Sequence, residues 1–443
     1  MLTRREFSRN FLAGGAALLA SDALPEVQRT SVANQGSLQY CDLLIKGGKV
    51  IDPGQHLNEV MDVAIKDGKI LEVSKNFPES RAAKVVSAKD RIVTPGLIDI
   101  HVHCFDGFGG VNPDHYCLGK GVTTVVDAGS AGYLGIGGFV QYVVKPSTTR
   151  VHSLMNIAAL GLLTGGAAKK TGHDPSEGFL NSMDNPDWIY PQLTANAAEA
   201  NKPAVVGIKV RLEQNVQGSR DLECLRMAHQ AAEGCRLPLM AHIDDPYSPL
   251  QDILKIMRKG DIFTHLYNNH SHGILDANGK VLPEVREARE RGVFLDPAQG
   301  RTHFSFDIAE KALQQDFPPD TISTDLNTGN SRKGVFDLPT MVSKFMALGM
   351  DLNRAIELVT VNPARIFNYG VKIGTLRPGY DADMAIFEIQ DGKFEFEDSD
   401  GAKRSGNKML LNRGAVCRGQ LYTAEILQEM EERRKKQNSS AGV

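Results

Sequence analysis

The chain has 443 residues, enough to bury the core of one large domain together with a smaller one. Its 50 lysines and arginines nearly balance 53 aspartates and glutamates, which does not favour nucleic acid as a partner. The six cysteines are scattered without a CxxC pair, so buried free thiols are expected rather than a disulfide framework.

The N-terminal segment differs in residue composition from the rest of the chain. A twin arginine, Arg4 and Arg5, precedes a short apolar run and a small-residue cleavage site at 21–23. This pattern resembles a twin-arginine export signal, and the run is too short to span a bilayer as a stable anchor. We therefore expect a signal peptide over 1–23, a linker over 24–40, and export to the bacterial periplasm by the twin-arginine machinery without a remaining membrane anchor.

Short strands with glycine turns open and close the remaining chain. "CDLLIKGGKVID" and "DVAIKDGKILEVSKN" have the alternation and turns of β-hairpin strands, and the same texture returns near the end in "AVCRGQLY". We therefore predict a small β-sandwich domain built from both chain ends, 41–95 and 366–424. The charged stretch 425–443 is predicted to be an exposed helix with a frayed tail.

Between these ends, apolar strand-like runs alternate with helical patterns. Eight such runs follow one another from "GLIDIHVH" to "DTISTDLN", with amphipathic stretches such as "DLECLRMAHQAAEG" between them. The alternation predicts an α/β fold, with a (β/α)₈ barrel of the TIM type over 96–365. A doubly wound open sheet is the alternative.

The first barrel strand ends in two histidines, His101 and His103, spaced by one valine. Side chains at i and i+2 of a strand point the same way, so the pair shares one face, a geometry that suits a metal. Functional groups of such barrels lie at the carboxyl ends of strands, and later strand ends also carry potential ligands. These later residues are Lys209, His242, His265 and Asp325. Each alone is a weak signal, whereas their conjunction in this order predicts a metal site.

In these motifs the chain resembles the amidohydrolase superfamily, the barrel metallohydrolases that include dihydroorotases, hydantoinases and deacetylases. The resemblance covers nearly everything from Leu43 to about Tyr422, with "LLIKGGKVIDPG", "VTPGLIDIHVH" and "NPARIFNYGVKIGTLRPGYDADMAIF" as its signatures. Within the superfamily, "GIKVRLE" and "GDIFTHLYN" look most like the deacetylase branch. Some members of this branch deacetylate acylated hydroxy or amino acids.

The resemblance implies a centre of two divalent ions, most readily zinc. His101, His103 and Asp325 would hold one ion, and His242 and His265 would hold the other. It further implies that a hydroxide bridging the ions attacks an amide or ester carbonyl of a small acylated amino or hydroxy acid. In this mechanism Asp325 acts first as the base and then as the acid.

Lys209 would bridge the two ions as a carbamate formed with carbon dioxide, again on the strength of the resemblance. An unmodified lysine, with a pKa near about 10.4, is a cation that repels metals, whereas its carbamate is an anion with two donor oxygens. The setting "GIKVR" favours two metals over the single metal of the superfamily's deaminases.

Substrate recognition is predicted at the mouth of the barrel. The side chains proposed to bind substrate there are Arg211, Asn268, His270 and Arg301. Phe105 stands where dihydroorotases have an arginine for the substrate carboxylate, and Asn327 stands where the branch commonly has a histidine. Arg301 and His303 replace smaller or less charged residues in the seventh-strand loop. We therefore expect a pocket whose shape and charge differ from those of the relatives.

Three interpretations follow for a chain of this kind. The first is an exported binuclear hydrolase acting on small acyclic substrates, and the second is a cyclic amidase with the same metals. The third is a non-catalytic barrel that serves as a binding protein, which the presence of all six ligand types disfavours. A small-molecule substrate is the expected partner, and a homo-oligomer is compatible with the sequence.

Overall fold

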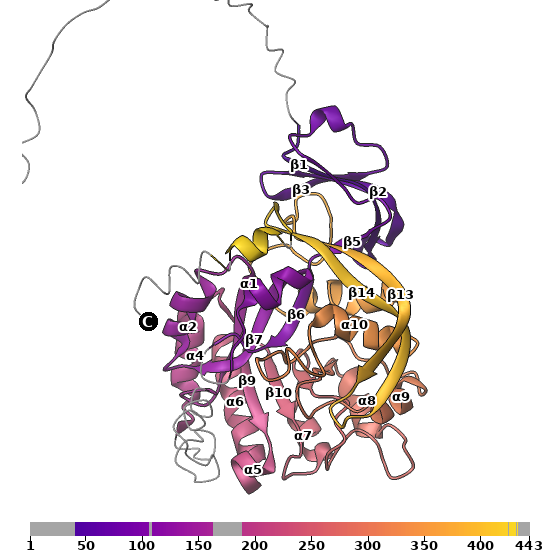
Figure 1. Cartoon of the computed structure of the whole chain (residues 1–443). Helices are drawn as coiled ribbons and strands as arrows, with labels where there is room; N and C mark the ends of the chain where they lie inside the picture. Colours follow the sequence, from indigo (N-terminus) through magenta and orange to yellow (C-terminus); the bar gives the residue numbers. More distant parts are fainter. Residues whose placement is uncertain (1–39, 106–108, 163–187, 424, 431, 433–443) are drawn as a thin grey trace, which may run out of the picture. The chain divides into compact units, whose positions relative to one another are not determined.

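The computed structural model describes residues 40–105, 109–162, 188–423, 425–430 and 432 (Figure 1). The predicted signal peptide, nearly all of the linker and most of the C-terminal tail lie outside these residues. Within the described part of the chain, every helix is too short or too polar to cross a membrane. All six cysteines are buried and free, as the sequence predicts.

Seven parallel strands form one sheet and follow one another in chain order. They are β6 (Leu97–Val102), β7 (Val122–Gly132), β8 (Arg150–Asn156), β9 (Val205–Leu212), β10 (Leu239–Ile243), β11 (Ile262–Thr264) and β12 (Phe294–Asp296). Every residue of β6, β7 and β8 is buried, as expected for parallel strands covered on both faces. The structure therefore confirms seven of the predicted barrel strands within a mixed α/β fold.

The eighth predicted run, 320–327, forms no regular strand, which corrects the sequence prediction. It still lies between the two ends of the curled sheet. The Asp320 amide donates to the Leu295 carbonyl beside β12, at 2.8 Å, and the His103 amide donates to the Leu326 carbonyl beside β6, also at 2.8 Å. The Thr324 hydroxyl bonds the Asp99 carboxylate at 2.6 Å. Such side-chain bonds compete with a regular ladder.

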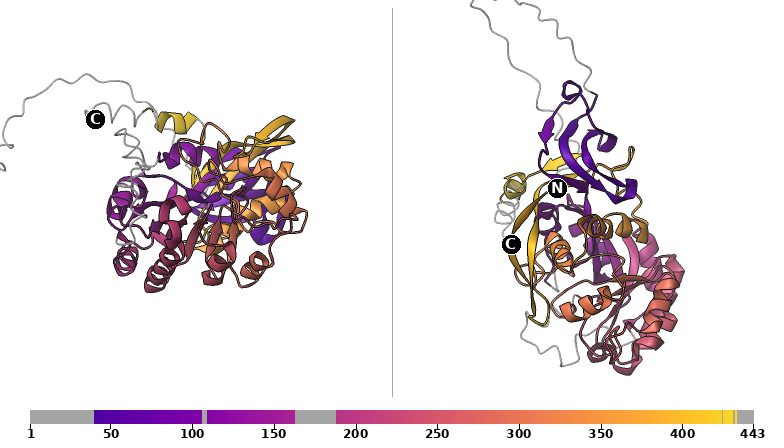
Figure 2. Two further views of the ribbon diagram at one scale, coloured as in Figure 1. Left: turned by 90° about the horizontal axis from the view of Figure 1, so that it is seen from below. Right: turned by 90° about the vertical axis from the view of Figure 1, so that its right-hand side faces the viewer.

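Helices lie between the strands of this sheet and follow its last strand, β12 (Figures 1 and 2). They are α1 (Pro113–Tyr116), α2 (Ile136–Phe139), α4 (Pro191–Ala200), α5 (Gln214–Gln217), α6 (Asp221–Cys235), α7 (Leu250–Ile256), α8 (Pro283–Glu290), α9 (Phe306–Leu313), α10 (Leu338–Ala347), α11 (Leu352–Leu358) and α12 (Val361–Ile366). α6 begins with the acidic residues Asp221 and Glu223, which complement the positive N-terminal end of a helix dipole. It packs beside β9 and β10, burying Leu225 and Ala228.

Strands from both chain ends join in a second, eight-stranded sheet. They are β1 (Leu43–Asp52), β2 (Leu57–Lys66), β3 (Lys69–Ser74), β4 (Val85–Ser87), β5 (Ile92–Pro95), β13 (Met384–Glu397), β14 (Lys403–Cys417) and β15 (Gln420–Tyr422). β5 pairs antiparallel with β13, so the two ends of the chain meet in one ladder. The predicted two-layer sandwich is not confirmed.

The long hairpin of β13 and β14 extends from this sheet along α10 (Figure 1). The Leu410 amide of β14 donates to the Ser343 hydroxyl of α10 at 2.9 Å, which ties the hairpin to the helix. The Asp337 carboxylate caps α10 by accepting from the Thr340 amide at 2.8 Å.

Candidate metal centre

The two histidines at the end of β6 are oriented by hydroxyl groups. His101 Nδ1 lies 2.9 Å from Thr264 Oγ1, and His103 Nδ1 lies 2.9 Å from Ser130 Oγ. The opposite ring nitrogens face Asp325, with His101 Nε2 at 3.6 Å and His103 Nε2 at 2.9 Å from Oδ1. These three side chains present their donor atoms to a common point.

Asp325 reaches this position through a left-handed backbone turn with φ of 53°. Its amide donates to the His101 carbonyl at 2.7 Å, which fixes it against β6. Its own carbonyl accepts from the side-chain amides of Asn327 at 3.1 Å and Asn330 at 2.8 Å. Asn327, noted in the sequence as a departure from the family pattern, therefore holds the backbone of a predicted ligand.

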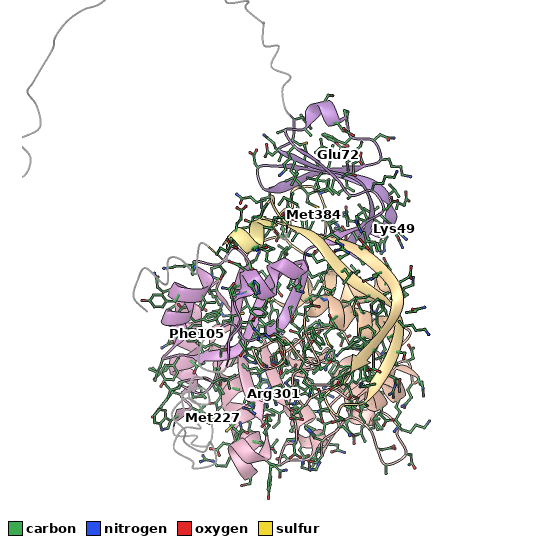
Figure 3. The ribbon with its side chains drawn as sticks, viewed as in Figure 1. Lys49, Glu72, Phe105, Met227, Arg301 and Met384 are labelled. Atoms are coloured by element: carbon green, nitrogen blue, oxygen red, sulfur yellow. The ribbon has the colours of Figure 1, made fainter. Side chains whose placement is uncertain are left out.

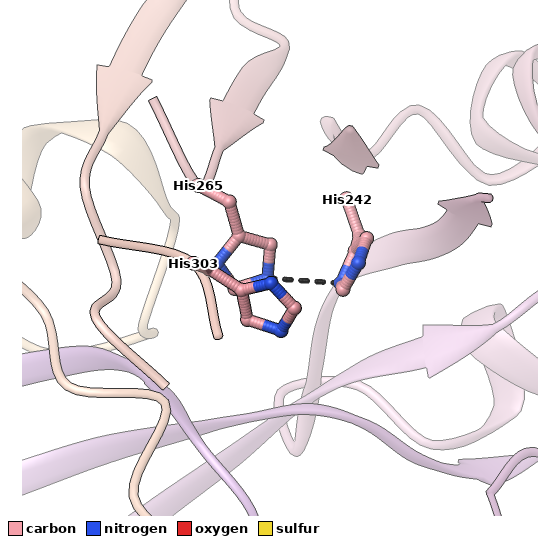
Figure 4. A group of neighbouring side chains, drawn as sticks. All are labelled: His242, His265 and His303. Carbon is pink, nitrogen blue, oxygen red and sulfur yellow. Dashed lines mark hydrogen bonds between the residues drawn. The ribbon is translucent and has the colours of Figure 1, made fainter. Parts of the chain in front are cut away.

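His242 of β10 and His265 beyond β11 form a second pair (Figure 4). His242 Nδ1 and His265 Nε2 lie 2.8 Å apart. The outer nitrogens of both rings meet protein oxygens, since His265 Nδ1 lies 2.8 Å from the Ala298 carbonyl and His242 Nε2 lies 2.7 Å from Glu213 Oε1. His265 therefore has one nitrogen held by the protein and one turned toward His242, whereas His242 Nε2 lies close to Glu213 without forming a hydrogen bond to any described residue.

Lys209 enters from β9 and is almost fully buried. Its Nζ lies 3.4 Å from His101 Nε2 and 3.3 Å from Met240 Sδ. Burial, the largest effect, lowers the pKa of Lys209 to about 7. Gly129 leaves room for this side chain, because a Cβ there would lie 2.8 Å from Lys209 Cγ.

The centre favours uncharged imidazoles. Burial is the largest effect that lowers the pKa of His101, His242 and His265 well below the ordinary histidine value, and neighbouring cationic groups add to it. Neutral imidazole is the form that binds metals.

Two cavities open onto these residues and share Arg211, His303 and Asp325 in their walls. The inner cavity of about 50 Å³ is lined by the predicted ligands His101, His103, Lys209, His242 and Asp325. The outer cavity of about 490 Å³ leads away from it. If the reacting group of a substrate lies in the inner cavity, the rest of the substrate lies in the outer cavity.

Comparisons with known proteins identify the family of the chain. A model of the amidohydrolase family matches residues 92–407. The chain belongs to the amidohydrolase family. It is 34% identical to a deacetylase of Enterococcus faecalis over 86% of this chain and 99% of the relative. It is 30% identical to a deacetylase of Brucella anthropi over 86% of this chain and 93% of that protein.

Solved structures extend the similarity to three dimensions. The structure of an adenine deaminase matches this amidohydrolase with a TM-score of 0.78 and 32% identity, over 86% of this chain and 100% of the other. A dihydroorotase structure matches with a TM-score of 0.74 and 27% identity, over 86% of this chain and 99% of the other. This amidohydrolase is therefore an enzyme, a hydrolase that acts on carbon–nitrogen bonds.

Two arginines predicted to bind substrate line the outer cavity. Arg211 lines both cavities, and its guanidinium forms a two-point ion pair with Glu213, with Nε–Oε1 and Nη2–Oε2 distances of 2.7 Å. Arg301, labelled in Figure 3, lies in the wall of the outer cavity. Arg211 is thus both paired and accessible from the cavity, so it holds a fixed orientation toward any ligand there.

The other two predicted substrate residues differ from each other. His270 lines the outer cavity and contacts the Asp244 carboxylate. Asn268 is buried, and its side-chain amide donates to the carbonyls of His265 at 2.8 Å and Ile243 at 3.2 Å. These bonds give Asn268 a role in shaping the loop that carries His265.

Three side chains of this amidohydrolase enter the site outside the predicted ligand and substrate-binding sets: Glu213, Asp244 and His303, of which only His303 was expected to shape the pocket. Glu213 lies beside His242, and Asp244 contacts both His270 and His303. Asp244 lies two residues beyond the expected ligand His242, and Glu213 lies four residues beyond the expected ligand Lys209, a spacing that could have identified them. His303 lies in a loop, where spacing carries no such signal.

Proposed function

We propose that this amidohydrolase uses two divalent metal ions, most readily zinc, to hydrolyse an amide or ester bond of small acylated amino or hydroxy acids. The observation that carries the proposal is the orientation of the imidazoles. His101, His103 and His265 each have Nδ1 on a protein oxygen and Nε2 turned toward another predicted ligand. Such outer contacts are typical of metal-binding histidines.

The donor set fits two ions. His101, His103 and Asp325 place one donor atom each within 4.8 Å of one another, and His242 and His265 form the neighbouring pair. Uncharged nitrogens and a single carboxylate suit zinc better than calcium or magnesium, which prefer oxygen ligands.

Lys209 fits the carbamate that we propose between the two ions. Carbon dioxide reacts with the uncharged amine, and burial lowers the pKa of Lys209 to about 7, so that this form is available near neutral pH. The Nζ atom lies beside His101 without a hydrogen-bonded carboxylate among the described residues. A carbamate would supply the negative charge that the cluster needs.

Protein side chains then account for proton transfer and orientation. Bound divalent ions supply a water of lowered pKa and polarise the scissile carbonyl. Asp325 accepts the proton of the attacking water and returns it to the leaving nitrogen or oxygen. Arg211 and Arg301 bind the carboxylate of the substrate in the outer cavity, which orients the acyl group toward Asp325.

The relatives named deacetylase support an acyclic acylated substrate. The dihydroorotase structure, at 27% identity, supports a cyclic amide as the second candidate substrate. Phe105 argues against a ring that needs an arginine two residues after His103.

Matched substrate panels test the proposal. Purified protein would be given N-acyl amino acids and O-acyl hydroxy acids on one panel and cyclic amides on the other, with proton release followed with and without chelator. We expect turnover of the acyclic substrates, and we expect the chelator to abolish it. Turnover of cyclic amides alone would replace the acyclic assignment, and turnover that persists after verified metal removal would overturn the metal-dependent mechanism.

A further inference from the structure

His303 is a buried histidine beside the centre that the predicted ligand set does not use. It follows β12 in the loop after Gly300, and its amide donates to the Gln299 carbonyl at 3.2 Å. Its ring centroid lies 4.0 Å from that of His265 and 5.0 Å from that of His242 (Figure 4). Its side chain is 12% exposed, so the imidazole belongs to the interior of the site.

The protein orients His303 in the same way as the predicted ligands. Its Nδ1 lies 2.8 Å from Asp244 Oδ2, and its Nε2 lies 3.4 Å from Thr302 Oγ1 and 4.0 Å from Asp325 Oδ2. Asp244 is itself buried and contacts His270 on its other oxygen. A metal-binding histidine commonly donates the N–H of its other ring nitrogen to a carboxylate, and this bond fixes the orientation of the ring. The contact between His303 and Asp244 matches this pattern.

The loop before His303 is built to permit this approach. Gly300 has a φ of 57°, which favours glycine, and its amide bonds the Thr324 carbonyl at 3.0 Å. A Cβ at this position would lie 2.3 Å from Asp325 Oδ2 and 2.7 Å from His303 Cδ2. The absence of a side chain therefore lets His303 and Asp325 come together.

We propose that His303 is a direct ligand of the ion that His242 and His265 hold. Donor atoms of these three histidines lie within 4.8 Å of one another, as a shared ion requires. The inference rests on the proposed metal-dependent function and adds a ligand to it. A third imidazole gives this ion three protein nitrogens besides the Lys209 carbamate, the same number of protein ligands that His101, His103 and Asp325 give the other ion.

The test measures metal binding directly. The full chain would be loaded with Zn²⁺, and the number of bound ions and their dissociation constants would be measured by elemental analysis and chelator competition. We expect His303→Ala to weaken one of two ions by about 100-fold or more, and Asp244→Asn to weaken the same ion by about 10- to 100-fold. His270→Gln, which removes the other imidazole on Asp244, is the matched control and should leave both affinities unchanged.

A cysteine at the same position distinguishes a direct ligand from a neighbour. His303→Cys loaded with Co²⁺ should acquire the sulfur-to-cobalt absorption band that forms only when a thiolate binds the metal. Circular dichroism and the melting temperature would check that both His303 variants fold. If they fold, wild-type affinity in His303→Ala and no such band in His303→Cys would overturn the ligand role alone. A wild-type chain that binds no ion would overturn both this inference and the proposed function.

Discussion

Two of the predicted ligands have backbone conformations that L-residues seldom adopt. Asp325 has a φ of 53° and His265 a φ of 72°. Such left-handed residues carry a cost on the order of 1–3 kcal/mol each, which the surrounding structure must offset. At Asp325 the offset comes from its amide bond to the His101 carbonyl and from two asparagine amides on its own carbonyl. The bonds hold the carboxylate where the histidines of β6 meet it.

Asp325→Asn tests the proton-transfer role of this carboxylate. The amide keeps the size and one oxygen donor but cannot accept a proton, so turnover should fall by about 10²- to 10⁴-fold while most of the metal stays bound. Steady-state kinetics and elemental analysis on the same preparation would measure both quantities. Unchanged turnover would remove Asp325 from the chemistry.

The residue scale also shows what the sequence can and cannot predict about the site. Strand ends of a parallel sheet meet at one edge, so His101, Lys209 and His242 could be placed together from spacing alone. His303 could not, because its position depends on the φ of Gly300 and on a contact with Asp244 that is remote in sequence. Loop geometry of this kind leaves no periodic pattern.

At the scale of single elements, β8 contains a buried histidine that is separate from the metal centre. His152 Nδ1 donates to the Pro203 carbonyl at 2.9 Å, and its ring packs edge-on against Tyr369 with centroids 5.0 Å apart. Burial is the main effect that lowers the pKa of His152 from 6.5 to about 4. The folded protein therefore holds this imidazole uncharged in a pH range where the unfolded chain protonates it.

His152 should accordingly contribute to acid sensitivity. Its folded pKa is depressed, so the unfolded state binds more protons between pH 6.5 and about 4, and stability falls as pH decreases through that window. The loss attributable to this residue is about 2 kcal/mol between about pH 7 and pH 5. In urea denaturation, His152→Gln should show a shallower pH dependence than wild type, whereas the exposed His272→Gln should not. Identical slopes for wild type and His152→Gln would contradict the assignment.

The elements were predictable to different degrees. Buried parallel strands such as β7 and β9 are long apolar runs that the sequence displays openly. The run 320–327 is more polar and forms no regular strand, because Thr324 bonds Asp99 and because Asp325 turns left-handed. The sequence predicted that strands from both chain ends join in one domain, and β5 of one end pairs with β13 of the other. The pattern of apolar residues does not predict the register of that pairing or the number of sheets that the strands form.

At the scale of the whole molecule, a buried ion pair connects the two sheets. Arg150, the first residue of β8, has its Nη2 2.7 Å from Asp381 Oδ2 and 3.2 Å from Asp383 Oδ2, just before β13. Burial raises the pKa of the Asp383 carboxyl, whereas Arg150 opposes that rise. The contact lies at the amino end of β8, away from the ligands.

Arg150→Met should therefore destabilise the fold without altering the metal site. Removing one partner of a buried ion pair costs about 3–5 kcal/mol. Asp381 keeps its contact with Lys69, but the buried Asp383 carboxylate would lose the charge that compensates it. Adding Asp383→Asn to the variant should recover part of the loss, which chemical denaturation of the single and double variants would measure. A single-variant loss below about 1 kcal/mol would show that the pair does not stabilise the native state.

Metal removal should lower the stability of the entire chain. The predicted ligands come from β6, β9, β10, the end of β11 and the segment before Leu326, so bound ions connect elements distant in sequence. An ion at a thousand times its dissociation constant adds about 4 kcal/mol to the native state. Chelation should lower the melting temperature by several degrees, and added Zn²⁺ should restore it. An unchanged melting temperature after verified metal loss would contradict a structural contribution of the ions.

The joining of β5 to β13 has a consequence for biosynthesis. Ile92–Pro95 is synthesised early, but its partner Met384–Glu397 emerges only after all seven strands of the parallel sheet have been made. Until then, the growing chain carries an open strand edge on the first half of the sheet, of the kind that templates aggregation. A product that terminates prematurely before Met384 keeps this edge permanently. Nonsense truncations late in the coding sequence should therefore yield insoluble protein rather than a shortened enzyme, even though every predicted metal ligand has already been made.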